Sequence, residues 1–340
     1  MPNATAKPLT IMRTATGSAP SVSQIRAFQE RGLRVVAVDC DPLAVGFVFA
    51  DAAYQVPVVS APDYLESLLE ICDTEQVDWL VPNLDEELVL LAQNRSKFEA
   101  LGTRLLLSST DVVATCTDKL KTAKFFDAHG IPGPRTLDGG APLRPADISQ
   151  YPQIVKPRFG RGSAGVHLVR DWEELQYQLA RSDRPVVQQF ARGVEYTIDA
   201  LTDFDGNPII ISPRRRLQTE SGISSKGACT WNEQIVKFVS QIVRELPIIG
   251  PANIQCFLAD DGQLLFTEVN ARIAGSCILS VAAGVPFFDG IVAMLKGEPL
   301  RPNIVPAPEL VMLRYWNETY LTLEDAERLA RQPHVSGARV

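Results

Sequence analysis

The first third of the chain alternates short aliphatic runs with helical patterns. Apolar and β-branched residues fill positions 9–12, 35–38 and 79–81, and helical patterns such as 64–72 separate these runs. Strands that alternate with helices form a parallel sheet joined by right-handed crossovers. The alternation therefore predicts an α/β domain with a parallel sheet over residues 1–112.

Two residues in this part could suggest a dinucleotide-binding site. Gly17 follows the first aliphatic run, and Asp39 ends the second, where an acid that binds a ribose would lie. The turn at 14–20 lacks the glycine pattern that lets the backbone approach a pyrophosphate. We therefore interpret Asp39 as a strand-end or loop residue.

The composition is that of a globular protein with more than one core. The chain has 340 residues, of which 46% are hydrophobic and 21% charged. The formal net charge is −7, whereas proteins that bind a phosphate backbone concentrate Lys and Arg. Nucleic acid is therefore not expected as a partner.

Cysteines and histidines give no pattern of a metal or disulfide framework. The six cysteines form no C-x-x-C pair, and His129, His167 and His334 lie far apart in the sequence. Zinc chemistry and a His-centred catalytic triad are not favoured. Residues 1–8 contain no leader-like apolar run, and no stretch reaches the roughly 18 apolar residues of a membrane span. We expect a cytoplasmic protein without a membrane partner.

A helix is expected after the first domain. Thr110 and Asp111 give an N-cap signal, and the pattern predicts one helix through Asp118 and Lys119 to His129. Glycines and prolines at 130–134 end it.

The connection at 157–165 is rich in glycine and lies between two predicted strands, 154–156 and 166–169. Gly160, Gly162, Ser163 and Gly165 leave backbone N–H groups free to converge on an anion, and Lys156 at the base adds a positive charge. The pattern predicts a flexible phosphate cover, and an ordinary glycine-rich hairpin is the alternative. The Lys-Ser/Thr ending of a P-loop is absent.

A second hairpin is predicted from the runs 252–258 and 264–270. If Asp261 and Gly262 are the two central turn residues, Gln255 lies opposite Glu268 and Asn253 opposite Asn270. All four polar side chains then share one face. The opposite face is expected to hold Ile254, Cys256, Leu265 and Val269, and the polar face also receives Phe257 and Phe266.

These polar residues offer oxygen ligands to a metal. Gln255, Glu268 and Asn270 suit Mg²⁺, which prefers hard ligands and keeps waters and nucleotide phosphates as further partners. A polar sheet face exposed to solvent is the alternative. Phe257 and Phe266 on the same face are unusual for such a surface.

Taken together, these motifs resemble the ATP-grasp superfamily over roughly residues 9–314, including a match of residues 82–88 to the end of its N-terminal domain. The resemblance is strongest to the synthetase domains of the carbamoyl-phosphate synthase large chain and to carboxylate-amine ligases. It implies a Rossmann-like N-terminal domain, a lid subdomain and a C-terminal catalytic subdomain with an antiparallel sheet. We place these at 1–112, 113–187 and 188–320, followed by a helical tail at 321–340.

The resemblance also implies roles for individual residues. Lys119 and Lys156 would be the nucleotide lysines, and Glu195 would bind the ribose hydroxyls. The other nucleotide residues would be the lid, Gly160, Gly162, Ser163 and Gly165, and the adenine hinge, Gln188, Gln189 and Phe190. Gln255, Glu268 and Asn270 would hold Mg²⁺, for which Mn²⁺ could substitute, and Arg272 would stabilise the transferring phosphoryl group.

Some residues depart from the family or match it only loosely. Gln189 stands where many members have Glu, and Ala271 stands where many have Pro. Arg214, Arg216 and Glu220 could face the acceptor carboxylate, although a basic run is more often a solvated or phosphate-pairing surface.

The function that the resemblance implies is an ADP-forming ligase. ATP would phosphorylate a small-molecule carboxylate, and an amine or another nucleophile would attack the acyl phosphate. One alternative is an enzyme like carbamoyl-phosphate synthase, acting on bicarbonate or carbamate. Another is an ATP-binding sensor without turnover. A homodimer is compatible with the sequence.

Overall fold

A computed structural model describes residues 7–220 and 222–330 of the chain. Residues 1–6, which belong to the stretch tested for a leader, lie outside the described residues, as do Ser221 and the part of the predicted tail at 331–340 with His334. The chain divides into two compact units, residues 1–108 with 286–301 and 315–340, and residues 109–285 with 302–314.

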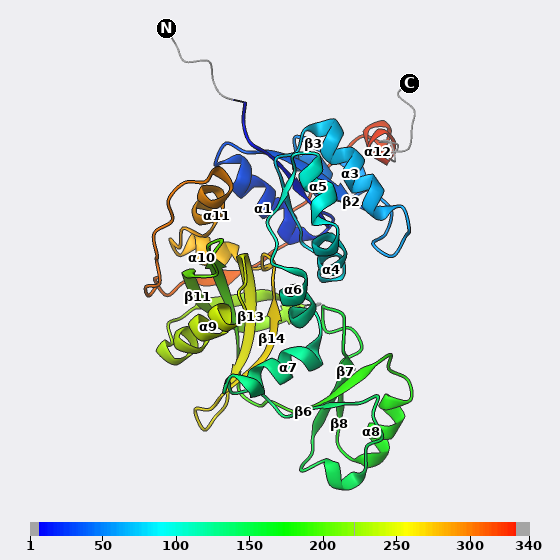
Figure 1. The fold of residues 1–340 in the computed structure, drawn as a ribbon, viewed down its shortest axis with the longest axis vertical. Coiled ribbons are helices and arrows are strands. Elements are labelled where there is room, and N and C mark those ends of the chain that lie inside the picture. The colour runs from blue at the N-terminus through cyan, green and yellow to red at the C-terminus, as the bar shows by residue number, and fades with distance from the viewer. Residues whose placement is uncertain (1–6, 221, 331–340) are drawn as a thin grey trace. The chain divides into compact units, whose positions relative to one another are not determined.

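The first unit contains the parallel sheet that the sequence predicts. Its strand order is β3-β2-β1-β4-β5, and every pairing is parallel. The strands are β1 (Thr10–Arg13), β2 (Arg34–Asp39), β3 (Ala52–Gln55), β4 (Trp79–Val81) and β5 (Arg104–Leu105). The helices of this unit are α1 (Ala19–Gln29), α2 (Gly46–Phe49), α3 (Tyr64–Glu75), α4 (Asp85–Gln93), α5 (Arg95–Ala100), α11 (Phe287–Lys296) and α12 (Leu323–Ala330) (Figure 1).

Helix α11 joins this unit from far along the chain. The Phe288 ring packs edge-on against Phe28 of α1, with 5.0 Å between the ring centroids. The Trp79 indole of β4 donates a hydrogen bond of 3.0 Å to the carbonyl of Leu295. The core of the first unit is therefore completed by residues that follow the predicted site motifs in sequence.

Asp39 has the strand-end role that the turn sequence favours. Its carboxylate accepts hydrogen bonds from the backbone N–H groups of Gly17, at 2.7 Å, and Asp41, at 2.9 Å. The carboxylate thus ties the loop after β1 to the end of β2.

The second unit begins with two helices and a small antiparallel sheet. The helices are α6 (Thr110–Cys116) and α7 (Lys119–Ala128). The sheet has the order β6-β9-β7-β8, with β6 (Thr136–Asp138), β7 (Gln153–Pro157), β8 (His167–Val169) and β9 (Pro185–Gln189). We call this four-stranded sheet the lid sheet. A 3₁₀ turn (Pro145–Asp147) and α8 (Trp172–Leu179) accompany it, and its hydrophobic core contains Val155, Val169, Leu175 and Val187.

The single helix expected from Thr110 to His129 is wrong, because it breaks at Asp118. The Asp118 carboxylate caps α7 by accepting from the backbone N–H groups of Leu120, at 3.0 Å, and Lys121, at 3.2 Å. A side chain that satisfies these donors starts a new helix. Lys119 therefore stands in the first turn of a helix instead of the middle of one.

A six-stranded antiparallel sheet forms the rest of the second unit, in the order β14-β13-β10-β11-β12-β15. Its strands are β10 (Val194–Thr202), β11 (Pro208–Glu220), β12 (Ile223–Cys229), β13 (Gly250–Leu258), β14 (Leu264–Asn270) and β15 (Val311–Leu313), and its helices are α9 (Glu233–Glu245) and α10 (Ile278–Ala282). The arrangement of one parallel and two antiparallel sheets confirms the expected fold.

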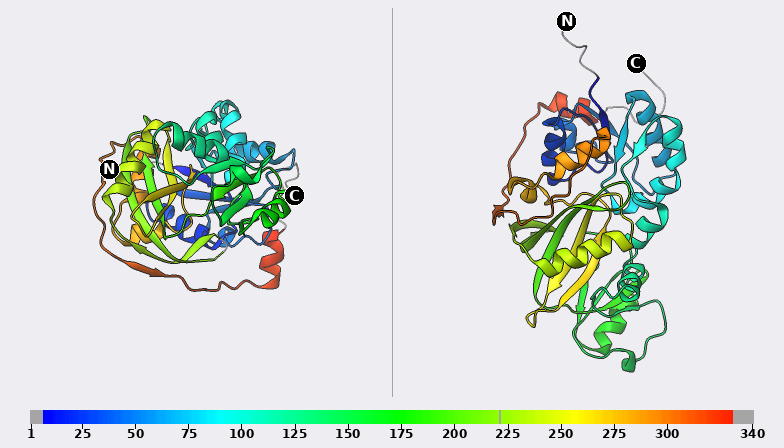
Figure 2. Two further views of the ribbon diagram at one scale, coloured as in Figure 1. Left: turned by 90° about the horizontal axis from the view of Figure 1, so that it is seen from below. Right: turned by 60° about the vertical axis from the view of Figure 1, so that its left-hand side comes forward.

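Helix α9 covers one face of the six-stranded sheet (Figure 2). Its buried residues Ile235, Val239 and Ile242 follow the helical period, and Phe238 packs against Phe266 of β14 at 5.8 Å. Because α9 covers this apolar face, side chains of the sheet that bind a ligand are expected on the opposite face.

Within the described residues, no helix is both long and apolar enough to cross a membrane.

Candidate active site

The polar face of the six-stranded sheet carries the predicted metal ligands. Gln255 of β13 pairs with Glu268 of β14, and Asn253 pairs with Asn270, which confirms the register expected from the sequence. Gln255 also lies opposite Thr197 of β10. Because directly opposed residues share a face, the predicted ligands point to the same side of the sheet.

The turn that set this register was placed wrongly. The hairpin closes through a longer loop, in which the N–H of Ala259 donates to the carbonyl of Gln263 at 2.8 Å. Nearer the loop, Cys256 pairs with Phe266 and Phe257 with Leu265, and a bulge then shifts the register by one residue. The shift at the loop and the extra residue in β14 compensate each other, so the pairs formed by the predicted metal ligands are those expected from the sequence.

The bulge exchanges two side chains between the faces. Phe266, expected on the polar face, is fully buried on the apolar side with Cys256. Leu265, expected on the apolar face, lies with Phe257 on the other side. Of the two phenylalanines that were unusual for a polar face, only Phe257 is there, and it lines the pocket described next.

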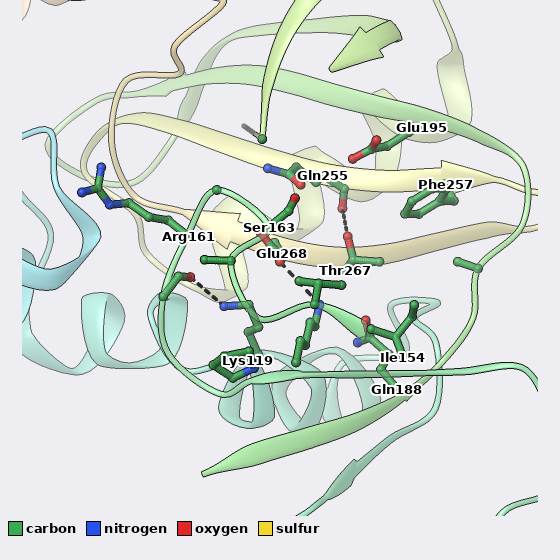
Figure 3. A pocket seen from close by; sticks show the side chains of 18 of the residues that line it. Lys119, Ile154, Arg161, Ser163, Gln188, Glu195, Gln255, Phe257, Thr267 and Glu268 are labelled. Carbon is green, nitrogen blue, oxygen red and sulfur yellow. Dashed lines mark hydrogen bonds and ion pairs between the residues drawn. The ribbon is translucent and has the colours of Figure 1, made fainter. Parts of the chain in front are cut away.

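A pocket lies between the lid sheet and the polar face of the six-stranded sheet (Figure 3). Glu195, Gln255 and Phe257 lie on one side, with Lys119, Ile154 and Gln188 across from them. The predicted residues that line it are Lys119, Lys156, Gly160, Gly162, Ser163, Gln188, Gln189, Phe190, Glu195, Arg216, Gln255 and Glu268. The other predicted site residues, Gly165, Arg214, Glu220, Asn270 and Arg272, are not among the described residues that line it.

Lys156 bridges the two sides of the pocket. Its side chain is 8% exposed, and its ammonium lies 3.4 Å from Oε1 of Glu268 on β14. Burial lowers the pKa of Lys156, an effect that the Glu268 carboxylate opposes and the Lys119 charge reinforces. A charge held in such surroundings acts more strongly on a bound phosphate than one in water.

Lys119 is attached to the glycine-rich connection. Its ammonium donates a hydrogen bond of 2.8 Å to the carbonyl of Gly160. Arg158, at the root of the connection, forms two bonds of 2.6 Å with Asp118, and the Lys119 N–H donates to the Arg158 carbonyl at 3.1 Å. Burial would raise the pKa of Asp118, but the hydrogen bonds from Arg158 and from backbone N–H groups outweigh it and the pKa is lowered.

The glycine-rich connection touches the tip of the β11–β12 hairpin. Gly160, Gly162 and Gly165 all have positive φ angles, a backbone conformation that residues with a side chain rarely adopt. A Cβ atom on Gly222 would lie 2.6 Å from the Cα atom of Gly162. The two backbones therefore approach as closely as glycine allows, and the connection closes over the pocket.

Glu195 and Arg216 form an ion pair on the floor of the pocket. Their closest atoms, Oε1 and Nη1, are 2.6 Å apart. Burial raises the pKa of Glu195, and the guanidinium of Arg216 works against this rise. Arg216 also donates to the carbonyl of Gly222 at 2.7 Å, so this pair connects the floor with the hairpin tip that touches the lid.

Strand β9, which carries the predicted hinge residues Gln188 and Gln189, lines the pocket beside apolar side chains. Gln188 donates to the Thr136 hydroxyl at 2.9 Å, which fixes its amide. Ile154 and Phe257 line the pocket beside it (Figure 3). Apolar walls with a few fixed polar groups are suited to a flat heterocyclic ring.

The donor set fits Mg²⁺ supported by a nucleotide. Gln255, Glu268 and Asn270 offer two amide oxygens and one carboxylate, and no group of three His, Cys, Asp or Glu residues comes together within the part of the chain that the structure describes. Mg²⁺ usually takes one or two carboxylates and completes its shell with waters and phosphates. These three residues could hold the ion once ATP supplies the remaining oxygens.

The three residues that the sequence suggested could face the acceptor carboxylate lie in different places. Arg216 reaches the pocket. Glu220 is exposed at the end of β11. Arg214 is buried, with 1% exposure, and pairs with Asp199, so it cannot contact a substrate in this pocket.

Several contributing residues were not anticipated. Asp118 and Arg158 fix the root of the lid, and Asp199 pairs with Arg214 beneath the polar face. Asp199 could have been found, because it continues the alternation of Glu195 and Thr197 along one face of β10. The Asp118–Arg158 contact joins residues 40 positions apart and leaves no local sequence signal.

Comparison with known proteins agrees with this geometry. Residues 14–106 match the family model of the PylC-like N-terminal domain, and residues 116–276 match that of the ATP-grasp domain. The carbamoyl phosphate synthase large chain of Clostridium beijerinckii is 24% identical over 323 residues, covering 86% of this chain. The chain spans only 29% of that relative's length.

Solved structures show the same fold. The L-amino acid ligase from Bacillus licheniformis aligns with a TM-score of 0.67 and 22% identity over 87% of this chain and 76% of its own. N5-carboxyaminoimidazole synthetase from Staphylococcus aureus, complexed with ADP, aligns with a TM-score of 0.72 and 18% identity over 90% of this chain and 82% of its own. The chain therefore carries an ATP-grasp domain, the domain of a family of ATP-dependent ligases, behind a PylC-like N-terminal domain.

Proposed function

We propose that the protein is an ADP-forming ligase that phosphorylates a small-molecule carboxylate and transfers the acyl group to an amine or another nucleophile. The observation that carries this proposal is the opposition of cations and metal ligands across one pocket. Lys119 and Lys156 come from the lid side, and Gln255 and Glu268 face them from the six-stranded sheet. Phosphoryl transfer depends mainly on such positioning and charge stabilisation.

Each residue has a defined task in this proposal. Lys119 and Lys156 hold the phosphates, and the backbone of residues 160–165 closes over them and excludes water. The Glu195 carboxylate accepts hydrogen bonds from the ribose hydroxyls, and Arg272 stabilises the phosphoryl group during transfer. Bound Mg²⁺ would neutralise the phosphate oxygens.

An acyl phosphate is the intermediate that the site supports. A covalent enzyme intermediate would need a nucleophile on the protein. Cys256, the cysteine of the β13–β14 hairpin, is fully buried on the apolar face. Burial raises its pKa to about 12, so the thiolate is not available near neutral pH. The substrate carboxylate therefore attacks the γ-phosphorus of ATP directly, and ADP leaves.

The test is ADP formation against panels of carboxylates and amines. With the right acid, hydroxylamine should trap a hydroxamate while ADP accumulates, and one heavy oxygen of a labelled carboxylate should pass into phosphate. Formation of AMP and pyrophosphate would show an adenylating mechanism and refute the proposal. Sustained ADP release separates the enzyme from an ATP-binding sensor, which would bind nucleotide without turnover.

Bicarbonate is a second candidate for the acid. The pattern of Gln255, Glu268 and Asn270 and the similarity to a carbamoyl phosphate synthase large chain support it. Carboxyphosphate would then take the place of the acyl phosphate. Dependence of ADP formation on added bicarbonate in degassed buffer distinguishes the two acids.

A further inference from the structure

We infer that the buried pair Asp199–Arg214 is a positioning device for the segment 271–277, which carries Arg272. The inference rests on the proposed function, in which Arg272 acts on the transferring phosphoryl group. It assigns a role to Arg214 that differs from the substrate contact expected from the sequence.

The pair lies on the same sheet face as the metal ligands. Arg214 is directly opposite Thr197, which is opposite Gln255, which in turn is opposite Glu268. Arg214 and Glu268 therefore belong to one cross-strand row, which continues beyond Arg214 to Cys229 of β12. In the next row, Asp199 is opposite Asn253, and Asn253 is opposite Asn270. Asp199 and Arg214 thus lie in the same two cross-strand rows as the predicted metal ligands, at positions of the polar face that are buried.

The pair is isolated from water and geometrically fixed. Arg214 is 1% and Asp199 0% exposed, and two parallel bonds of 2.7 Å join the guanidinium to the two carboxylate oxygens. A bidentate pair of this kind allows one orientation of the guanidinium plane. Its remaining edge is therefore aimed in a fixed direction.

That edge holds the segment after β14. Nη1 of Arg214 donates a 2.7 Å hydrogen bond to the hydroxyl of Ser276, four residues after Arg272. The Ser280 hydroxyl, in α10, donates to Asp199 at 2.6 Å. A second arginine, Arg314, donates to the carbonyl of Gly275 at 3.1 Å. The segment forms no helix or strand between Asn270 and Ile278, and Ile273 and Cys277 are buried. These side-chain hydrogen bonds add directional anchoring to that burial.

Stability alone does not explain a fully buried ion pair. Removing two charges from water is costly, and apolar residues of similar volume often stabilise a core at least as well. Unlike an apolar contact, the pair directs a hydrogen bond from Arg214 to the hydroxyl of Ser276 and so fixes the position of that residue. Its value lies in placing the backbone that follows the metal ligands.

The connection between pair and segment can be cut without leaving an unpaired charge. Ser276→Ala removes the bond from Arg214 to the segment and keeps Asp199–Arg214 intact. Ser212→Ala is the matched control, because Ser212 is also buried and its hydroxyl donates only to Ser280, at 3.0 Å. Ser276→Thr retains a hydroxyl at the position.

The measurements are ADP release with Mg·ATP, Mg·ADP binding by calorimetry, and backbone hydrogen exchange of residues 271–277. Ser276→Ala should lower kcat by about ten- to a hundredfold, since small misplacement of a group that acts in the transition state is costly. Its Mg·ADP affinity should change by less than about twofold, and exchange of the segment should speed up by about tenfold. Ser212→Ala should resemble the wild type, and Ser276→Thr should recover most of the rate.

Equal exchange of the segment in Ser276→Ala and Ser212→Ala would overturn the inference, as would equal kcat values. A loss of Mg·ADP affinity with unchanged kcat would overturn it too. Absence of ADP release from the wild-type protein would instead refute the proposed function, and hydrogen exchange would still decide whether Arg214 anchors the segment.

Discussion

At the scale of single residues, Glu268 is the only charged member of the proposed Mg²⁺ ligands, and it also contacts Lys156. Glu268→Gln keeps the shape of the side chain and removes its charge. We expect Mg-dependent turnover to fall by at least about a hundredfold because the ion loses its one carboxylate. ADP release over a Mg²⁺ titration measures this, and circular dichroism checks the fold.

Glu233→Gln is the control for this change, because Glu233 is exposed in the first turn of α9. It should turn over like the wild type. Full activity in Glu268→Gln at all Mg²⁺ concentrations would remove Glu268 from the metal site.

The lowered pKa of Lys156 predicts an alkaline limit on activity. The ammonium loses its proton below the ordinary value of 10.5, so phosphate stabilisation should decline as pH rises through that window. Because the unfolded chain binds more protons there, the free energy of unfolding should rise with pH in the same window. Arginine stays protonated, so Lys156→Arg should keep a flat profile at a lower maximal rate.

The measurement is kcat/KM for Mg·ATP from about pH 6 to 10. Lys121→Arg, at an exposed site on α7, should leave the wild-type profile unchanged. Parallel alkaline declines in the wild type and in Lys156→Arg would assign the titration to another group.

Much of the site could be predicted at this scale, because cations, glycines and oxygen ligands occur in a characteristic order. Lys119, Lys156, Glu195, Gln255 and Glu268 all line one pocket. Partners that meet only through the tertiary structure could not be predicted. Arg214 is an example, since a run of three arginines does not reveal which one is buried against a carboxylate.

At the scale of elements, the close contact of lid and hairpin gives the next prediction. Gly222→Ala would place a Cβ atom 2.6 Å from the Cα atom of Gly162, so the lid could not close as it does. We expect the apparent KM for Mg·ATP to rise about tenfold or more and the lid to be cut by protease even with ATP bound.

Gly262→Ala separates this contact from backbone strain. Gly262 has a similar positive φ of +85°, against +76° for Gly222, and its Cβ atom would meet nothing within 4 Å. Both variants bear the cost of a left-handed alanine, about 1 kcal/mol. Only Gly222→Ala should lose protection of the lid by ATP, and equal protection in the two variants would argue against docking.

Element boundaries were the least predictable part of the fold. The hairpin was found from two flanking runs, but the loop was misplaced because Asp261-Gly262 is a strong turn signal and a bulge has none. The helix break at Asp118 was missed because the apolar pattern continues across it, while capping by the aspartate decides the boundary.

At the scale of the whole molecule, α11 is part of the first unit. Phe288→Ala would open a cavity between α11 and α1, where Phe288 is fully buried against Phe28 and Phe287. The free energy of unfolding should fall by about 3–5 kcal/mol in urea. Tyr320→Ala, at a side chain that is 85% exposed, should change it by less than about 0.5 kcal/mol. Equal stability of the two variants would contradict this packing.

The parallel sheet and the two hairpins followed from the sequence pattern, because hydrophobic periodicity is local, whereas the complete antiparallel sheets were expected only from the family resemblance. The return of α11 did not, since its apolar residues fit a core helix of either unit. The contacts of Trp79 with Leu295 and Phe28 with Phe288 span more than two hundred positions and depend on the folded chain.

The division into two units has a consequence for synthesis. The chain passes from one unit to the other after residues 108, 285, 301 and 314. On a ribosome, the parallel sheet would emerge before α11 and would wait for α11 to cover Phe28 and Trp79. The second unit has most of its sequence available before then. The parallel sheet is thus synthesised before the second unit but completed after it, and a fragment ending near residue 112 would leave apolar surface uncovered.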